Sequence, residues 1–188
     1  MGQSMTCENQ PIHLALIDAG LGQKSLTSAL CQHAAESADE SSVQVTTFCA
    51  NDHHILPYGE PGVEGAEDLT QTLSAADGVI LVFPVYNFNM NATLKAVIEH
   101  GGPAMEGKVV GLMASAGGRF GYMSFVSVIQ GLLFDQRCWI VPRQVYALAE
   151  DFSEGRLSNA DVLRRVRELV ETTADMARRL KASAPCSS

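Results

Sequence analysis

Short apolar runs alternate along the chain with segments in which apolar residues recur at helical spacing. The runs IHLALI, GVILVF and KVVGLMA are apolar at almost every position, which is typical of buried parallel strands. Two further runs, SVQVTTF and RCWIVPRQVYAL, also predict strands. The helical patterns that separate and follow these strands cover residues 25–36, 63–76, 91–100, 123–135 and a segment that begins at Ser158.

Two helix boundaries carry sequence signals. We expect the helix over 91–100 to end at Gly101-Gly102-Pro103, because glycine and proline commonly follow the last helical turn. The last helix opens on an expected capping box, Ser158-Asn159-Ala160-Asp161. The face of that helix that we expect to be buried carries Val162, Val166, Leu169, Thr173, Ala177 and Leu180.

The order of these elements defines a fold class. Five strand-then-helix units follow one another, and no hairpin signal separates any two strands. Parallel strands need helical crossovers, which cover both faces of the sheet. The pattern therefore predicts an α/β protein, a flavodoxin-like three-layer α/β/α sandwich with a five-stranded parallel sheet in the order 2-1-3-4-5. We expect a single domain over residues 1–188, with its core at about 12–181.

Composition and charge argue against several classes of protein. The net charge of −8 disfavours a nucleic-acid surface, and no apolar run reaches the ~18 residues of a membrane span. The five cysteines are widely spaced without a Cys-x-x-Cys pair, and the first residues lack the apolar core of an export signal. We therefore predict a cytoplasmic protein with reduced thiols and without nucleic-acid or membrane partners. His53-His54 fits a solvated loop better than a metal site, so no metal is expected.

The first strand leads into the loop DAGLGQKSL, which has the small residues of a phosphate-binding turn. A nucleoside-triphosphate loop needs glycines where this chain has Gln23 and Asp18, and a dinucleotide fingerprint needs a third glycine at Ser25. Backbone N–H groups from Gly22 to Thr27 at a helix N-terminus would still attract a monophosphate ester. The alternative stays open that Ser25 only caps the helix and the glycines only make a turn.

Two later loops offer partners for a planar ring. In PVYNFNMNATLK, Pro84 stiffens the strand exit, Tyr86 and Phe88 can flank a ring, and Asn87 offers an amide. In SAGGRFG, Gly117-Gly118 would let a flat group approach the backbone. Loops after the first, third and fourth strands meet at one edge of such a sheet, which predicts a site for a phosphorylated planar heterocycle. Ordinary surface anchoring by the aromatic residues and a simple glycine turn are the alternatives.

Two segments carry a resemblance to a known family. FPVYNFNMNATLKAVIEH is similar to a Pro-x-Tyr-Asn loop with a following Leu-Lys helix, and GLMASAGGRFGYMS is similar to a Ser-Ala-Gly-Gly loop. Both loops are found in the NADPH-dependent FMN reductase family, which includes flavin, quinone, azo-dye and chromate reductases. The resemblance extends from about Ile12 to Val145.

The resemblance implies an FMN site at these loops. The family's first loop usually reads Gly-Ser-Leu-Arg…Ser-x-Asn and binds the phosphate, whereas here Gly22 replaces the arginine and leaves Ser25 and backbone amides as the main contacts. Val85 stands where many members carry a polar residue. Arg119 would lie beside the ring and hold the NADPH phosphates or the flavin N1–O2 edge, and the alternative that it is a solvated loop cation stays open. The implied cofactor contacts are Gly20, Gly22, Gln23, Lys24, Ser25, Thr27, Pro84, Val85, Tyr86, Asn87, Phe88, Ser115, Gly117, Gly118 and Arg119.

The function that the resemblance implies is that of an NAD(P)H-dependent FMN oxidoreductase. NADPH or NADH would be the co-substrate, and a quinone, azo compound, metal oxyanion or free flavin would accept the electrons. Since the flavin N5 carries the chemistry, no catalytic acid–base pair is expected. A non-enzymatic electron carrier of flavodoxin type is the alternative, although its Thr/Ser-x-Thr-Gly-x-Thr loop is absent. A degenerate interaction module is a third possibility, and a homodimer or homotetramer is expected from the family.

Overall fold

The computed structural model describes residues 11–22, 25–41, 43–53, 55, 57–61 and 63–183. Its strands are β1 (His13–Asp18), β2 (Gln44–Cys49), β3 (Gly78–Tyr86), β4 (Asn89–Met90), β5 (Val109–Ala116), β6 (Trp139–Ile140), β7 (Val145–Leu148), β8 (Phe152–Ser153) and β9 (Arg156–Leu157). Its α-helices are α1 (Leu26–Glu40), α2 (Ala66–Ala75), α3 (Ala92–Met105), α4 (Ser124–Phe134) and α5 (Ala160–Ser183). The short 3-10 helices are η2 (Ala50–Asp52), η3 (Arg119–Met123) and η4 (Ala149–Asp151).

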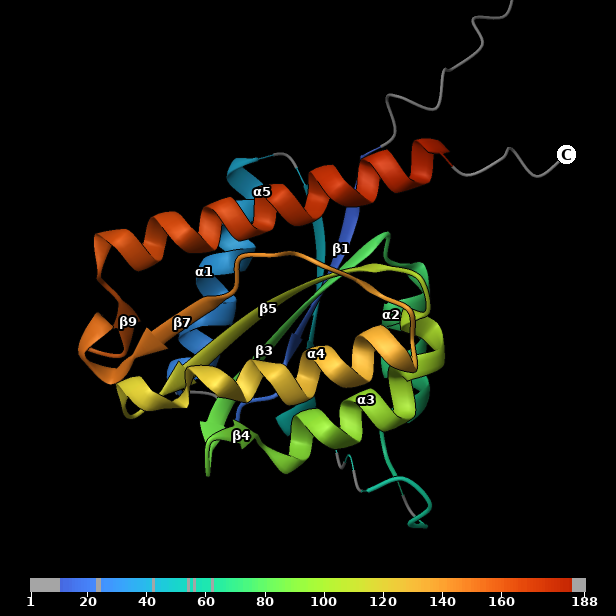
Figure 1. The fold of residues 1–188 in the computed structure, drawn as a ribbon, viewed down its shortest axis with the longest axis horizontal. Helices are drawn as coiled ribbons and strands as arrows, with labels where there is room; N and C mark the ends of the chain where they lie inside the picture. The colour runs from blue at the N-terminus through green and yellow to red at the C-terminus, as the bar shows by residue number, and fades with distance from the viewer. Residues whose placement is uncertain are drawn as a thin grey trace, which may run out of the picture.

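The main sheet lies between two layers of helices (Figure 1). Parallel pairing sets β2, β1, β3 and β5 side by side in that order, and both β6 and β7 pair with the far edge of β5. The flavodoxin-like class is confirmed, and the parallel strands follow the predicted order 2-1-3-4-5 if β6 and β7 count as one. The sheet has seven strands and not five. The interruption between β6 and β7 contains Pro142, which cannot donate a hydrogen bond to a neighbouring strand.

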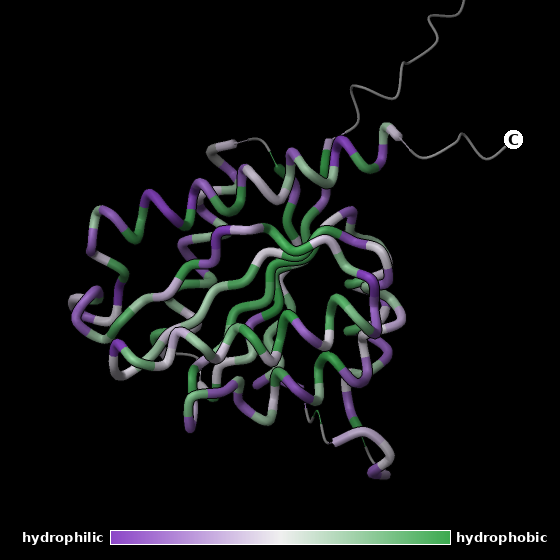
Figure 2. The backbone as a smooth tube through the Cα atoms, viewed as in Figure 1, coloured by the Kyte–Doolittle hydropathy of each residue, from purple (hydrophilic) through white to green (hydrophobic). Residues whose placement is uncertain are grey.

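Burial on both sheet faces explains the uninterrupted apolar runs. In β1, Leu14 and Leu16 pack with α1 and α5, whereas Ala15 and Ile17 pack with α2, α3 and α4. All four side chains are fully buried. The central strands accordingly form the most hydrophobic region of the backbone trace (Figure 2). Within the part of the chain that the structure describes, no helix combines the length and apolarity that a membrane crossing requires.

The expectation that no hairpin joins two strands is wrong. At the end of β3 the chain reverses through Asn87 and Phe88, which have φ angles of 50° and 59°, and returns as β4. Positive φ at both central residues defines the tight turn that matches the twist of two antiparallel strands. Glu154 and Gly155 make a second such turn between β8 and β9. A phenylalanine rarely adopts this conformation, so the first turn could not be expected from its residues.

The helix end expected at Gly101-Gly102-Pro103 is also wrong, because α3 continues to Met105. A Cβ on Gly101 would overlap the Cδ1 atom of Leu73 on α2, and a Cβ on Gly102 would lie 2.7 Å from Gln136 Nε2. The two glycines therefore permit close packing of α3 against its neighbours. Pro103 falls in the last turn of the helix.

The cap of α5 lies one residue later than expected. Asn159 Oδ1 accepts the N–H groups of Asp161 and Val162 at 2.9 and 3.4 Å. The hydroxyl of Ser158 instead donates to the Asp151 carbonyl at 3.1 Å, so the capping box that begins at Ser158 is wrong. The buried face is confirmed for Val162, Val166, Leu169, Thr173 and Ala177, and Leu180 packs at its margin.

Replacing Gly101 with alanine tests the close packing of α2 and α3. Overpacking against Leu73 should lower the free energy of unfolding by about 1–3 kcal/mol. The higher helix propensity of alanine should offset ~1 kcal/mol of that loss. Gly131→Ala on α4 is the matched control, because a Cβ there meets no atom within 4 Å. Urea unfolding should show a lower midpoint for Gly101→Ala and a higher one for Gly131→Ala. Equal gains in both variants would contradict the packing account.

Candidate functional site

The loops that follow β1, β3 and β5 meet at the edge of the sheet where these strands end. Strand register brings them there, since Asp18 pairs with Val82 and Pro84 pairs with Ser115. The three loops enclose a cleft of about 480 Å³, here called the first cleft. Its volume lies within the range of small-molecule sites. The sequence-predicted residues that line it are Gly22, Ser25, Thr27, Pro84, Val85, Tyr86, Ser115 and Gly117.

Ser25 both caps α1 and lines the first cleft. Its Oγ accepts the N–H of Ser28 at 3.0 Å, which is the interaction of a helix N-cap. Gly22 is held at the same place, because its carbonyl accepts the Ser25 N–H at 3.0 Å and the Ser28 hydroxyl at 3.1 Å. The N-terminus of α1 therefore faces the cleft with the partial positive charge of its helix dipole. The two proposed roles of Ser25, cap and cleft residue, do not exclude each other.

Two buried hydrogen bonds fix the loops relative to one another. The hydroxyls of Thr27 and Ser115 lie 2.8 Å apart and connect the first turn of α1 with the end of β5. The side-chain amide of Asn91 donates to the Ala19 carbonyl at 2.8 Å, and its oxygen accepts the Leu94 N–H at 3.2 Å. Asn91 thus caps α3 and holds the first loop at once. The relative positions of all three loops are set before any ligand binds.

A second cleft of about 300 Å³ continues from the first and shares Val85, Ala116 and Gly117 with it. Asn87, Phe88 and Gly118 from the predicted set also line this second cleft. A Cβ added at Gly117 or Gly118 would meet no atom within 4 Å, so both glycines border open space. A flat group could therefore lie directly against this stretch of backbone.

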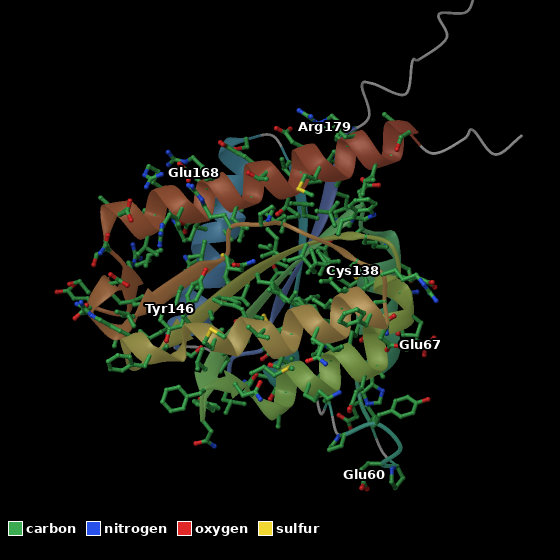
Figure 3. The ribbon with its side chains drawn as sticks, viewed as in Figure 1. Glu60, Glu67, Cys138, Tyr146, Glu168 and Arg179 are labelled. Carbon is green, nitrogen blue, oxygen red and sulfur yellow. The ribbon has the colours of Figure 1, made fainter. Side chains whose placement is uncertain are left out.

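Tyr146 of β7 (labelled in Figure 3) holds the loop that carries these glycines. Its hydroxyl donates to the Gly118 carbonyl at 2.6 Å. Burial raises the pKa of the phenol, and a hydrogen bond with the Gly121 backbone opposes that rise. The phenol therefore stays protonated at neutral pH and remains a donor. Tyr146 lines the second cleft and also packs against the core of the sheet.

Two of the described predicted site residues, Gly20 and Arg119, do not line either cleft. A Cβ on Gly20 would stand 2.7 Å from Ser25 Oγ and 2.9 Å from Asp18 Oδ1, so Gly20 allows close packing within the first loop. Arg119 Nη2 is 2.7 Å from Glu150 Oε1, and its side chain is 75% exposed. Gln23 and Lys24 lie outside the described residues. The lining residues that sequence reasoning missed are Leu21, Leu26, Ala116, Phe120, Gly121 and Tyr146.

Four of the six missed residues had a usable signal, because they are chain neighbours of predicted ones: Leu21, Leu26, Ala116 and Phe120. Among the described lining residues of both clefts, none carries a formal charge. Backbone N–H groups, hydroxyls and the α1 dipole are therefore the features by which the described part of the site could bind an anion.

Tyr122 and His53 lie outside both clefts. Tyr122 packs edge-on against Phe125 and Tyr146, with ring centroids 5.3 and 5.7 Å away, and lines neither cleft. His53 stacks on Phe48 with ring centroids 4.5 Å apart, and His54 lies outside the described residues. Among the residues that can be described, no three His, Cys, Asp or Glu side chains form a potential metal site.

Comparison with protein families identifies the chain. Residues 12–153 match the model of the NADPH-dependent FMN reductase family, and the chain belongs to that family. It is therefore an oxidoreductase that uses FMN, with NAD(P)H as co-substrate. Comparison with curated proteins gave no match.

Solved structures of low sequence identity share the fold. An oxidoreductase from Corynebacterium diphtheriae is 24% identical, with a TM-score of 0.71 over 88% of this chain and 98% of that one. An NADH:FMN oxidoreductase in its apo form is 19% identical, with a TM-score of 0.74 over 93% and 92%. The flavoenzyme NAD(P)H:(acceptor) oxidoreductase FerB from Paracoccus denitrificans is 17% identical, with a TM-score of 0.71 over 89% and 98%.

A double-mutant cycle tests the link between the first and last loops. Thr27→Val and Ser115→Ala should each lower the free energy of unfolding of the FMN-free protein by about 1–3 kcal/mol, because each leaves a buried hydroxyl without its partner. The double variant should lose about 1 kcal/mol less than the sum of the two. Strictly additive losses in urea unfolding would show that the hydroxyls do not interact.

Proposed function

We propose that this protein passes electrons from NAD(P)H through FMN to a small acceptor, such as a quinone, an azo compound, a metal oxyanion or free flavin. Convergence of the three loops on two joined clefts carries the proposal, and the described residues that line these clefts bear no formal charge. The loops supply a helix N-terminus at one end of this space and exposed glycine backbone at the other. A singly phosphorylated planar coenzyme needs both features.

The phosphate of FMN would bind at the start of α1. Ser25 Oγ lies 3.0 Å from Ser28 Oγ, whose own hydrogen goes to the Gly22 carbonyl, so the Ser25 hydroxyl would turn its hydrogen from Ser28 to the phosphate. Its oxygen would still accept the Ser28 N–H, and the first-turn N–H groups add further donors. Gly22 leaves room for the phosphate, because a Cβ there meets nothing within 4 Å. Binding would therefore depend on a helix dipole and neutral donors rather than on the arginine usual in the family.

The flavin ring would lie against Gly117 and Gly118, with Tyr86 and Phe88 at its margins. When bound, FMN supplies hydride acceptance and electron transfer. Backbone N–H groups near Asn87, Gly117 and Gly118 would stabilise negative charge on the reduced ring, and Pro84 and Val85 would exclude water from one side. The side chain of Arg119 is paired with Glu150, so it would have to leave that carboxylate to reach the cofactor. Its contact with the cofactor stays a prediction.

We also propose that the chain forms a homodimer or homotetramer, as sequence reasoning expected. Large apolar side chains are exposed around the second cleft, including Phe88, Phe120 and Met123, at 68%, 88% and 67% exposure. Such a concentration is typical of interaction surfaces. A second copy placed there would cover the open side of the ring site. A cytoplasmic location remains part of the same proposal.

Purified full-length protein with added FMN should oxidise NADH or NADPH well above the rate of free flavin, and a panel of the named acceptors should accelerate the reaction. Ser25→Ala should weaken FMN binding about tenfold or more, because a charge-assisted hydrogen bond is lost. Affinity for riboflavin, which lacks the phosphate, should change little and controls for the lost helix cap. The measurement is flavin fluorescence quenching. Equal losses for FMN and riboflavin would contradict phosphate binding at Ser25.

A further inference from the structure

The turn between β3 and β4 holds a phenylalanine in a backbone conformation that is unfavourable for its side chain. Asn87 and Phe88 have φ angles of 50° and 59°. Asparagine tolerates this left-handed region, whereas a bulky side chain there is strained, and glycine is the usual second residue of such a turn. The local conformation therefore does not account for a phenylalanine at this position.

Burial of the Phe88 ring does not compensate for the strain, because the residue is 68% exposed. Other groups hold the turn in place. The strand β4 pairs with the end of β3, and Asn89 Oδ1 accepts the hydroxyl of Ser127 on α4 at 2.5 Å. These bonds fix the backbone without using the ring. Strain that is maintained in this way is typical of functional sites, which directs attention to what the ring could contact.

A second exposed phenylalanine borders the same space. Phe120 lies in η3, is 88% exposed, and lines the second cleft together with Phe88 and the glycine backbone that follows β5. Among the residues that the structure describes, neither ring contacts another aromatic ring. Two such rings, on different loops of one cleft, could contact a flat molecule by offset or edge-on stacking.

The charge around the second cleft favours a neutral molecule. None of the described residues that line it carries a formal charge. Arg119, the chain neighbour of Phe120, has its Nη2 atom 2.7 Å from Glu150 Oε1. The chain as a whole has a net charge of −8 and therefore repels small anions. A planar, uncharged electron acceptor fits this cleft better than an oxyanion does.

We propose that Phe88 and Phe120 select a planar, uncharged acceptor of the quinone class against metal oxyanions. This inference rests on the proposed function, because the acceptor must reach a flavin bound in the same space. A quinone has a flat apolar ring that can contact both side chains, whereas an oxyanion has no apolar surface to bury. In the net reaction a quinone gains two electrons and two protons. NAD(P)H supplies both electrons and one proton, and the solvent supplies the other.

Two substitutions of Phe88 test whether the turn is strained. Phe88→Gly and Phe88→Ala both remove the ring, but only alanine keeps a Cβ at positive φ. Urea unfolding should therefore give a higher midpoint for the glycine variant, which is the reverse of the usual order of these two residues. A lower midpoint for the glycine variant would show that the turn is not strained, and would overturn the proposal.

Equilibrium dialysis of menadione, an uncharged naphthoquinone, tests the ring contacts without turnover. In the full-length protein, with and without FMN, Phe88→Gly and Phe120→Ala should each weaken menadione binding about tenfold. Phe88→Tyr keeps an aromatic ring and should restore most of the affinity. Phe134→Ala is the matched control, because Phe134 is 82% exposed at the end of α4 and lines neither cleft. Equal affinity in all four variants would overturn the proposal.

Steady-state kinetics at saturating FMN test selectivity. The unaltered protein should show a higher kcat/KM for menadione than for chromate, and Phe88→Gly should lower that ratio about tenfold. Preference for chromate, or an unchanged ratio in active Phe88→Gly, would refute the inference alone.

Two further outcomes separate this inference from the proposals on which it depends. Loss of the oligomer in sedimentation, with unchanged menadione binding by Phe88→Gly, would assign the ring to the subunit interface and refute the acceptor contact. An unaltered protein that neither binds FMN nor oxidises NAD(P)H would refute the proposed function. Dialysis with the FMN-free protein would then still decide whether Phe88 and Phe120 bind the quinone.

Discussion

Parallel pairing of β1, β3 and β5 is the constraint on which the whole site depends. Since the three strands run in one direction and in register, their carboxyl ends lie at one edge and their following loops must meet there. Packing on both sheet faces fixes this register, because β1 places alternate side chains in two separate cores. A slip of one residue would exchange those faces and move every loop.

Hydrogen bonds between residues far apart in the sequence then hold the loops in place and define the cavity. Thr27 and Ser115 join the first and last loops, and Asn91 ties the first loop to α3. Tyr146 holds the Gly118 carbonyl from a different strand. All the groups in these bonds are neutral, and no described lining residue of the two clefts carries a formal charge. The affinity for a phosphate would therefore come from oriented backbone dipoles. Because these groups are already fixed, binding would need little further ordering.

The sequence predicted the fold class well, because apolar runs and helical spacing report burial directly. It failed where a residue served a distant partner. Gly101 was predicted to end a helix, but it lies within α3, where the lack of a side chain allows α3 to pack against Leu73 of α2. The turn at Asn87 and Phe88 was missed because its phenylalanine lies in a conformation that glycine and asparagine usually occupy.

The candidate site was likewise predicted where it depends on local sequence and missed where it depends on distant partners. Residues within the three loops were predicted from local chemistry, and most of them line the two clefts. The place of Tyr146 was beyond reach, because the second cleft combines elements far apart in the chain. The pairing of Arg119 with Glu150 and the proximity of Thr27 to Ser115 are likewise not visible in the order of residues. Pairing and proximity of this kind arise only when the chain folds.

A crystal structure of the protein with FMN bound tests the central claim most directly. The account predicts the phosphate within hydrogen-bonding distance of Ser25 and the first turn of α1, and the flavin ring against Gly117 and Gly118. A phosphate bound at another place, or a ring that does not touch the loop after β5, would contradict it.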